Sequence, residues 1–208
     1  MFRDRTDAGS RLAEALVASN INADIVLAVP RGGLPVARAV ADALDLPLDV
    51  IAARKLGAPN NPELAIGSVA ADGTVWINDQ LVKQVGVSEG YIERTRRAEA
   101  AIAQDKLTRY RSGSTPLDLT GQHVLIVDDG IATGATTIAC VRAARNAGAA
   151  SVTLAVPVGP PSSVEILEGE ADAVVCLETP RSFGSVGRFY RDFGQVSDEA
   201  AIQYLDRE

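Results

Sequence analysis

Two adjacent aspartates at the end of an apolar run carry the clearest chemical signal in the sequence. Residues 124–127 are Val-Leu-Ile-Val, and Asp128 and Asp129 follow them directly. A carboxylate pair can accept hydrogen bonds from two vicinal hydroxyl groups of a sugar and can face a divalent cation. Because ligands of open α/β sheets bind at the carboxyl ends of strands, this pair predicts a sugar site.

A turn rich in glycine and threonine follows the aspartates and leads into a helical pattern. Its glycines let the backbone approach a ligand closely, and the free N–H groups of a helix start favour a phosphate group. Together with the acid pair, the turn predicts a cradle for a sugar 5′-phosphate. The expected contacts are Gly130, Ile131, Ala132, Thr133, Gly134, Ala135, Thr136 and Thr137.

Basic residues follow two earlier apolar runs. Arg31, Gly32 and Gly33 come after the first run, and Arg54 and Lys55 come after the second. Glycine amides and a forked guanidinium are suitable donors for an anion such as diphosphate. Taken alone, an Arg-Gly-Gly turn or two surface cations can also be purely structural.

The elements that must position these residues read as a parallel α/β sheet. Residues 24–29 read as a continuous apolar run, typical of a strand buried on both faces, and residues 48–52, 123–127, 151–157 and 173–177 read as further strands. Helical spacing covers residues 7–19, 34–44, 88–111, 135–147, 162–168 and 198–205. We expect one domain, residues 1–208: a single parallel sheet flanked by helices, with an irregular cap.

The cap is expected from an insertion, residues 54–116, and from the tail, residues 181–208. Within the insertion we predict a loop at 54–62, strands at 64–70 and 74–78 forming a hairpin, and the long helix at 88–111. That helix mixes positive and negative charges, which is typical of a solvated or subunit-facing surface.

Composition limits the classes of function. The chain has 208 residues and a net charge of −7, which argues against a nucleic-acid partner. His123 is the only histidine, which argues against a Ser-His-Asp triad and against a zinc site built from protein ligands. We see neither a signal peptide nor an apolar stretch long enough for a bilayer, so we expect a cytoplasmic protein without membrane contact.

The strand, acid pair and Thr-Gly-x-Thr turn at residues 124–137 resemble the signature of type I phosphoribosyltransferases, which bind phosphoribosyl pyrophosphate (PRPP). The layout Val-Pro-Arg-Gly-Gly-Leu-Pro, then Arg-Lys-Leu-Gly-Ala-Pro, then the cradle is similar to a bacterial and archaeal group called predicted phosphoribosyltransferases. The acid pair also resembles the start of response-regulator receivers. Those need a phospho-acceptor aspartate and a lysine on later strands, and no lysine follows Lys106.

The resemblance implies roles for the residues named above. Asp128 and Asp129 would hold the ribose and meet Mg2+ through water, while Arg31, Gly32, Arg54 and Lys55 would meet the diphosphate. Asp128, Asp129, Arg31 and Lys55 are the candidate catalytic residues. It also implies a cis peptide bond near Arg31-Gly32, a mobile lid at residues 57–63 and a homodimer.

Many members of this family carry a hood that stacks an aromatic residue on the acceptor base. Phe189 and Asp192 in the tail are our candidates for that contact, although such aromatics can also simply dock a tail onto the core. Ala132 stands where enzymes for hypoxanthine and guanine usually have an aspartate, which weakens an assignment to those bases.

The expected reaction is transfer of the 5-phosphoribosyl group from PRPP to a nitrogenous acceptor, with release of pyrophosphate. A PRPP or nucleotide sensor without catalytic activity is the alternative on the same fold. A hydrolytic or phosphorylase-like activity on a nucleotide is a third interpretation.

Overall fold

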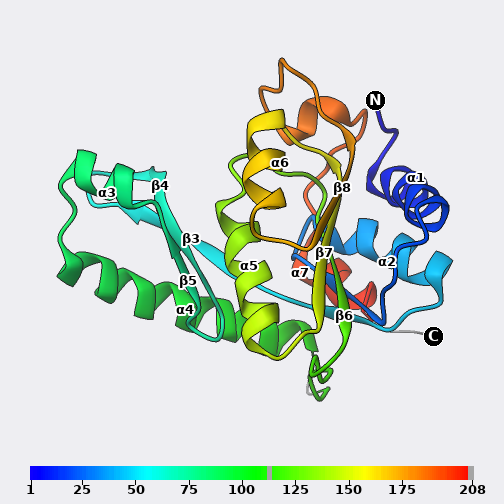
Figure 1. The fold of residues 1–208 in the computed structure, drawn as a ribbon, viewed down its shortest axis with the longest axis horizontal. Coiled ribbons are helices and arrows are strands. Elements are labelled where there is room, and N and C mark those ends of the chain that lie inside the picture. The colour runs from blue at the N-terminus through cyan, green and yellow to red at the C-terminus, as the bar shows by residue number, and fades with distance from the viewer. Residues whose placement is uncertain (112–113, 206–208) are drawn as a thin grey trace.

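A five-stranded parallel sheet forms the centre of the computed structural model, which describes residues 1–111 and 114–205 (Figure 1). Its order is β2-β1-β6-β7-β8. The strands are β1 (Ile25–Ala28), β2 (Leu48–Val50), β6 (His123–Val127), β7 (Ser151–Val158) and β8 (Ala173–Glu178). The predicted α/β class with one parallel sheet flanked by helices is confirmed.

Successive residues of a strand point to opposite faces of the sheet. Apolar side chains lie on both faces, and helices cover each of them. Val26 and Ala28 belong to one core cluster, whereas Ile25 and Leu27 belong to the other. The first cluster is covered by α1 (Arg5–Ala18), α2 (Gly33–Leu44), the end of α4 (Glu89–Arg111) and α7 (Asp198–Gln203). The second is covered by α5 (Ala135–Asn146) and α6 (Pro161–Glu168).

Residues 53–111 form an arm, which projects from the body of the molecule (Figure 1). Three antiparallel strands in the order β3-β4-β5 build its sheet. The elements before α4 are β3 (Ala53–Ala58), β4 (Asn61–Ala70), β5 (Val75–Ile77) and α3 (Asp79–Val85). Leu56, Ile66 and Val69 are buried in a separate small core, where Tyr91 and Ile92 of α4 pack against them.

The loop predicted for residues 54–62 is wrong as secondary structure, whereas the lid role given to residues 57–63 stays a prediction. Residues 53–58 pair with β4 as a strand, with register shifts on either side of Gly57. Glycine, proline and asparagine there hide the strand pattern, because only Leu56 and Ala58 are buried in this strand. Helix α3 was not predicted; it begins at Asp79 and is capped by Asn78, whose side chain accepts a hydrogen bond from the Leu81 amide.

The tail packs against the beginning of the chain. The Phe2 amide donates to the Phe189 carbonyl oxygen at 2.7 Å, and the rings of Phe2 and Tyr190 lie 5.3 Å apart. A short 3-10 helix, η1 (Val186–Phe189), lies within this tail. Among the described residues, no helix has the length and apolar character needed to cross a membrane.

Candidate functional site

The acid pair lies at the carboxyl end of β6, in the middle of the parallel sheet. Asp128 accepts a hydrogen bond from the Asp129 amide at 2.8 Å. Burial raises the pKa of Asp128 well above its usual value, and repulsion from Asp129 adds to that effect. Burial also raises the pKa of Asp129, although a hydrogen bond from Arg5 opposes it. Both aspartates are half-buried and line one cleft, where repulsion between them favours a ligand that brings hydroxyl donors or a cation.

The Arg-Gly-Gly loop meets this pair directly. An added Cβ at Gly32 would lie 2.0 Å from Asp129 Oδ2, and one at Gly33 would lie 3.1 Å from Asp128 Oδ1. Only glycine leaves room for so close an approach. The cis peptide bond of this loop joins Pro30 to Arg31, one bond before the Arg31-Gly32 bond.

The loop and the acid pair share a cleft of about 510 Å3. Arg31, Gly32, Asp128, Asp129 and Thr136 line one part of it. The structure thus brings residues that are far apart in sequence to one cleft, and their role as a ligand site stays a prediction.

The threonine-bearing turn after the pair has both open and buried positions. Thr133 is exposed and Thr136 lines the cleft, whereas Thr137 is only 4% exposed. The turn ends at Gly134, which has a φ of 78° and caps α5. The arm reaches this place as well, because the buried Ser68 hydroxyl of β4 donates to the Ala135 carbonyl oxygen at 2.5 Å.

Arg5 completes the cleft, and sequence reasoning missed it. Its Nε donates to Asp129 Oδ2 at 2.8 Å, its Nη1 donates to the Gly194 carbonyl oxygen at 2.7 Å, and its guanidinium lies 3.8 Å from the centre of the Phe193 ring. Tyr190 donates its hydroxyl to the Asp129 carbonyl oxygen at 2.6 Å. These contacts join the first turn of α1 and the tail to the acid pair.

The tail closes the other side of the cleft with Val186, Phe193, Gln195 and Val196. Of the tail aromatics, Phe193 lines the cleft, whereas the ring of our candidate Phe189 stacks on Phe183 with centroids 5.5 Å apart. Asp192 lies outside the cleft lining, and its side chain accepts a hydrogen bond from the Gly194 amide. No local pattern separates Phe193 from the other aromatics of the tail.

Arg54 and Lys55 lie on β3, and both are paired with acids. Arg54 forms an ion pair with Glu99 of α4, and Lys55 Nζ lies 2.7 Å from Glu63 Oε2 at the tip of the hairpin. Neither side chain lines the cleft as it is formed by the described residues. Their contact with a ligand therefore stays a prediction that requires the hairpin to move.

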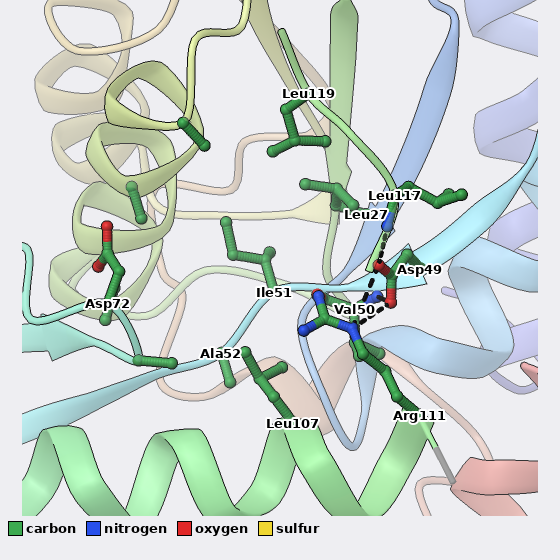
Figure 2. A pocket seen from close by; sticks show the side chains of 14 residues that line it. Leu27, Asp49, Val50, Ile51, Ala52, Asp72, Leu107, Arg111, Leu117 and Leu119 are labelled. Carbon is green, nitrogen blue, oxygen red and sulfur yellow. Dashed lines mark hydrogen bonds and ion pairs between the residues drawn. The ribbon is translucent and has the colours of Figure 1, made fainter. Parts of the chain in front are cut away.

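A second hollow lies between the parallel sheet and the arm, including helix α4 of the arm, and the acid pair does not line it (Figure 2). Its walls are mainly apolar, and a buried ion pair closes one end, where Arg111 Nε lies 2.9 Å from Asp49 Oδ1. Asp49 also accepts a hydrogen bond from the Leu117 amide, and Arg111 donates to the Val50 carbonyl oxygen. The pair thus fixes the end of α4 to β2 and to the chain that leads into β6.

We expect Arg111→Ala to lower the free energy of unfolding by about 2 to 3 kcal/mol, because Asp49 would stay buried without its guanidinium. The two side chains are only 18% and 9% exposed. Urea denaturation measures the change. Lys55→Ala, at the exposed pair with Glu63, is the control and should change stability by less than about 1 kcal/mol. An equally small change for Arg111→Ala would contradict a structural role of the buried pair.

Comparison with known proteins adds independent information. The sequence model of the phosphoribosyl transferase domain family matches residues 3–193. A Mycobacterium tuberculosis H37Rv protein, provisionally named as a phosphoribosyl transferase, is 45% identical over 207 residues, which cover 100% of this chain and 47% of that protein. The chain thus spans about half the length of the curated relatives it matches.

Two further relatives extend the comparison. The uracil phosphoribosyltransferase of Streptomyces griseus is 33% identical over 93 residues, covering 44% of this chain and 42% of that enzyme. The crystal structure of TT1426 from Thermus thermophilus has a TM-score of 0.84 at 40% identity, covering 99% of this chain and 97% of that one.

Proposed function

Because the chain belongs to the phosphoribosyl transferase domain family, we propose that it transfers the 5-phosphoribosyl group of PRPP to a nitrogenous acceptor, a nucleobase, and releases pyrophosphate. The observation that carries the proposal is the acid pair facing the Arg31–Gly33 loop and Thr136 across one cleft. A sugar phosphate with a diphosphate at its anomeric carbon needs acceptors for its hydroxyl groups and donors for its phosphate groups, and this cleft has both.

Each part of the cleft has one task in this proposal. Asp128 and Asp129 accept hydrogen bonds from the ribose hydroxyls. The turn from Gly130 to Thr137 holds the 5′-phosphate with backbone amides and hydroxyl groups. Gly32, Gly33 and Arg31 hold the diphosphate, and we assign Arg54 and Lys55 to the same group after closure of the hairpin.

The donor set suits Mg2+ bound mainly through the substrate. The described residues contain no cluster of three or more His, Cys, Asp or Glu that could hold a metal by themselves. Two adjacent carboxylates are hard oxygen donors, and Mg2+ usually takes one or two carboxylates together with phosphates and water. When bound, Mg2+ would offset negative charge on the diphosphate.

The chain's own residues then favour departure of pyrophosphate ahead of attack by the base, with inversion at the anomeric carbon. Arg31 stabilises the charge that develops on the leaving diphosphate. The acid pair faces the ribose as the ring gains positive character. Phe193 and Val186 offer apolar surface to a flat acceptor, and Gln195 offers an amide to its edge.

A panel of nucleobases tests the proposal. With PRPP, Mg2+ and one base at a time, we expect one base to support release of pyrophosphate and formation of its nucleotide. Calorimetry on the same protein measures PRPP binding directly. PRPP binding without turnover across the panel would favour a sensor, base release from a nucleotide would favour a hydrolytic activity, and failure to bind PRPP would overturn both PRPP-based interpretations.

A further inference from the structure

Arg5 contacts both walls of the cleft, the acid pair on one side and the tail on the other. Its Nε donates to Asp129 Oδ2 at 2.8 Å, and its Nη1 donates to the Gly194 carbonyl oxygen at 2.7 Å. The same guanidinium lies 3.8 Å from the centre of the Phe193 ring, and Arg5 and Phe193 both line the cleft. Because the three contacts use different parts of one flat and rigid group, they fix its position and its orientation.

Helix α1 keeps Arg5 in this place. Arg5 is the first residue of α1, and α1 packs closely on α2, because an added Cβ at Gly9 would lie 2.6 Å from the Val36 carbonyl oxygen. Helix α2 begins at Gly33, within the loop that faces the acid pair. The backbone that carries Arg5 is therefore held by the same helix that continues this loop.

The ion pair with Arg5 leaves Asp129 able to bind a ligand. A carboxylate can accept about four hydrogen bonds, and Arg5 Nε takes one of these positions on Oδ2. The side chains of Arg5 and Asp129 are only 12% and 14% exposed, so water competes little for their contact. Among the residues that the structure describes, Arg5 donates no hydrogen bond to Asp128, and the two acids of the pair differ in this respect.

We propose that Arg5 is a positioning residue, which holds the Asp129 carboxylate in the orientation that the ribose hydroxyls of PRPP require. The proposal rests on the proposed function, because it takes PRPP as the ligand of Asp129. A carboxylate that is fixed in advance loses less conformational freedom when the ligand binds. Because Gly194 and Phe193 hold the same guanidinium, Arg5 also keeps the acid for the ribose and the tail wall for the acceptor in a fixed relation. Arg5 acts through Asp129 and does not touch PRPP.

Calorimetry with PRPP and Mg2+ tests the assignment without requiring the acceptor. We expect Arg5→Gln to weaken PRPP binding by about 10-fold or more, as loss of a partner that orients a ligating carboxylate does. Arg5→Lys keeps the charge, but one ammonium group cannot replace the forked contacts with Asp129 and Gly194, so its loss should lie within about 3-fold of that of Arg5→Gln. Arg11→Gln is the matched control on α1, because Arg11 forms an exposed ion pair with Asp7 and does not line the cleft; it should leave binding unchanged.

The two acids of the pair show whether Arg5 acts through Asp129. The loss of PRPP binding caused by Arg5→Gln should be at least about 5-fold smaller in an Asp129→Asn background than in an Asp128→Asn background. Thermal unfolding checks that each variant is folded, and Arg5→Lys replaces Arg5→Gln in the comparison if the glutamine variant is not.

Three results would overturn the assignment and leave the proposed function standing. Equal losses in both backgrounds would show that Arg5 does not act through Asp129. Full PRPP binding by Arg5→Lys would show that a positive charge alone is enough, and tighter binding by Arg5→Gln would show that the ion pair blocks the site. If the unaltered protein does not bind PRPP, the proposed function fails and this assignment fails with it.

Discussion

Asp128→Asn and Asp129→Asn are each expected to lower kcat/KM for PRPP by about 100-fold or more, a loss typical of removing a charged group that stabilises the transition state. Asparagine has nearly the same shape as aspartate, but it is neutral and exchanges one carboxylate oxygen for a donor. It therefore keeps the packing while it removes acceptors for the ribose hydroxyls and negative charge facing the sugar.

Asp128→Asn should leave the free protein at least as stable as before at neutral pH, whereas Asp129→Asn also removes the charge that pairs with Arg5, so for that variant we expect a small loss of stability. Burial and mutual repulsion already disfavour two charged carboxylates here, as the raised pKa values of Asp128 and Asp129 indicate. A neutral amide removes that repulsion. Pyrophosphate release and thermal unfolding, measured on the same preparations, should thus move independently.

Asp24→Asn is a matched control for this experiment. Asp24 is exposed and precedes β1 at the opposite end of the sheet, where its carboxylate accepts a hydrogen bond from the His123 amide. It should leave both kcat/KM and the melting temperature nearly unchanged. Normal turnover of PRPP by Asp129→Asn would show that the acid pair does not hold the ribose.

The parallel sheet and its acid pair could be predicted because their signals are local. Residues 124–127 of β6 are all apolar and lie between two other buried strands, and the side chains that follow must lie at the carboxyl edge. Asp128 and Asp129 therefore had only one region in which to lie. The Arg31 loop follows the neighbouring strand β1, so its closeness to the pair follows from the same topology.

The arm and the residues that close the cleft could not be predicted from local sequence signals. Strand β3 is stabilised by pairing with β4 and by packing under α4, which are contacts that its own composition does not reveal. Arg5 meets Asp129 across 124 positions of sequence, and Phe193 lies over the Arg5 guanidinium rather than at a recognisable motif. Such contacts depend on how the two ends of the chain pack together.

Gly32→Ala is expected to weaken PRPP binding by about 100-fold and to lower the free energy of unfolding by about 1 to 3 kcal/mol, as overpacking of a filled site does. The backbone itself would accept alanine, because Gly32 has a φ of −61° and a ψ of −34°. The effect comes from space: the new Cβ would lie 2.0 Å from Asp129 Oδ2 and 2.7 Å from its Cγ. Asp129 must therefore move, which breaks its hydrogen bond with Arg5.

Gly90→Ala provides the control for a glycine without such a neighbour. An added Cβ there would meet only the flexible end of Arg94, at 3.5 Å, and Gly90 lies within α4. Alanine in a helix should raise the free energy of unfolding by about 0.5 to 1 kcal/mol and leave PRPP binding unchanged.

A double-mutant cycle separates the steric clash at Gly32 from any other effect of the substitution. In an Asp129→Ala background the clashing carboxylate is absent, so Gly32→Ala should cost less than about 0.5 kcal/mol of stability there, compared with the full loss in the unaltered protein. Denaturant unfolding of the four proteins gives the coupling energy between the two positions. If Gly32→Ala destabilises both backgrounds equally, the loop and the acid pair are not in contact, and the cleft that unites them does not exist in solution.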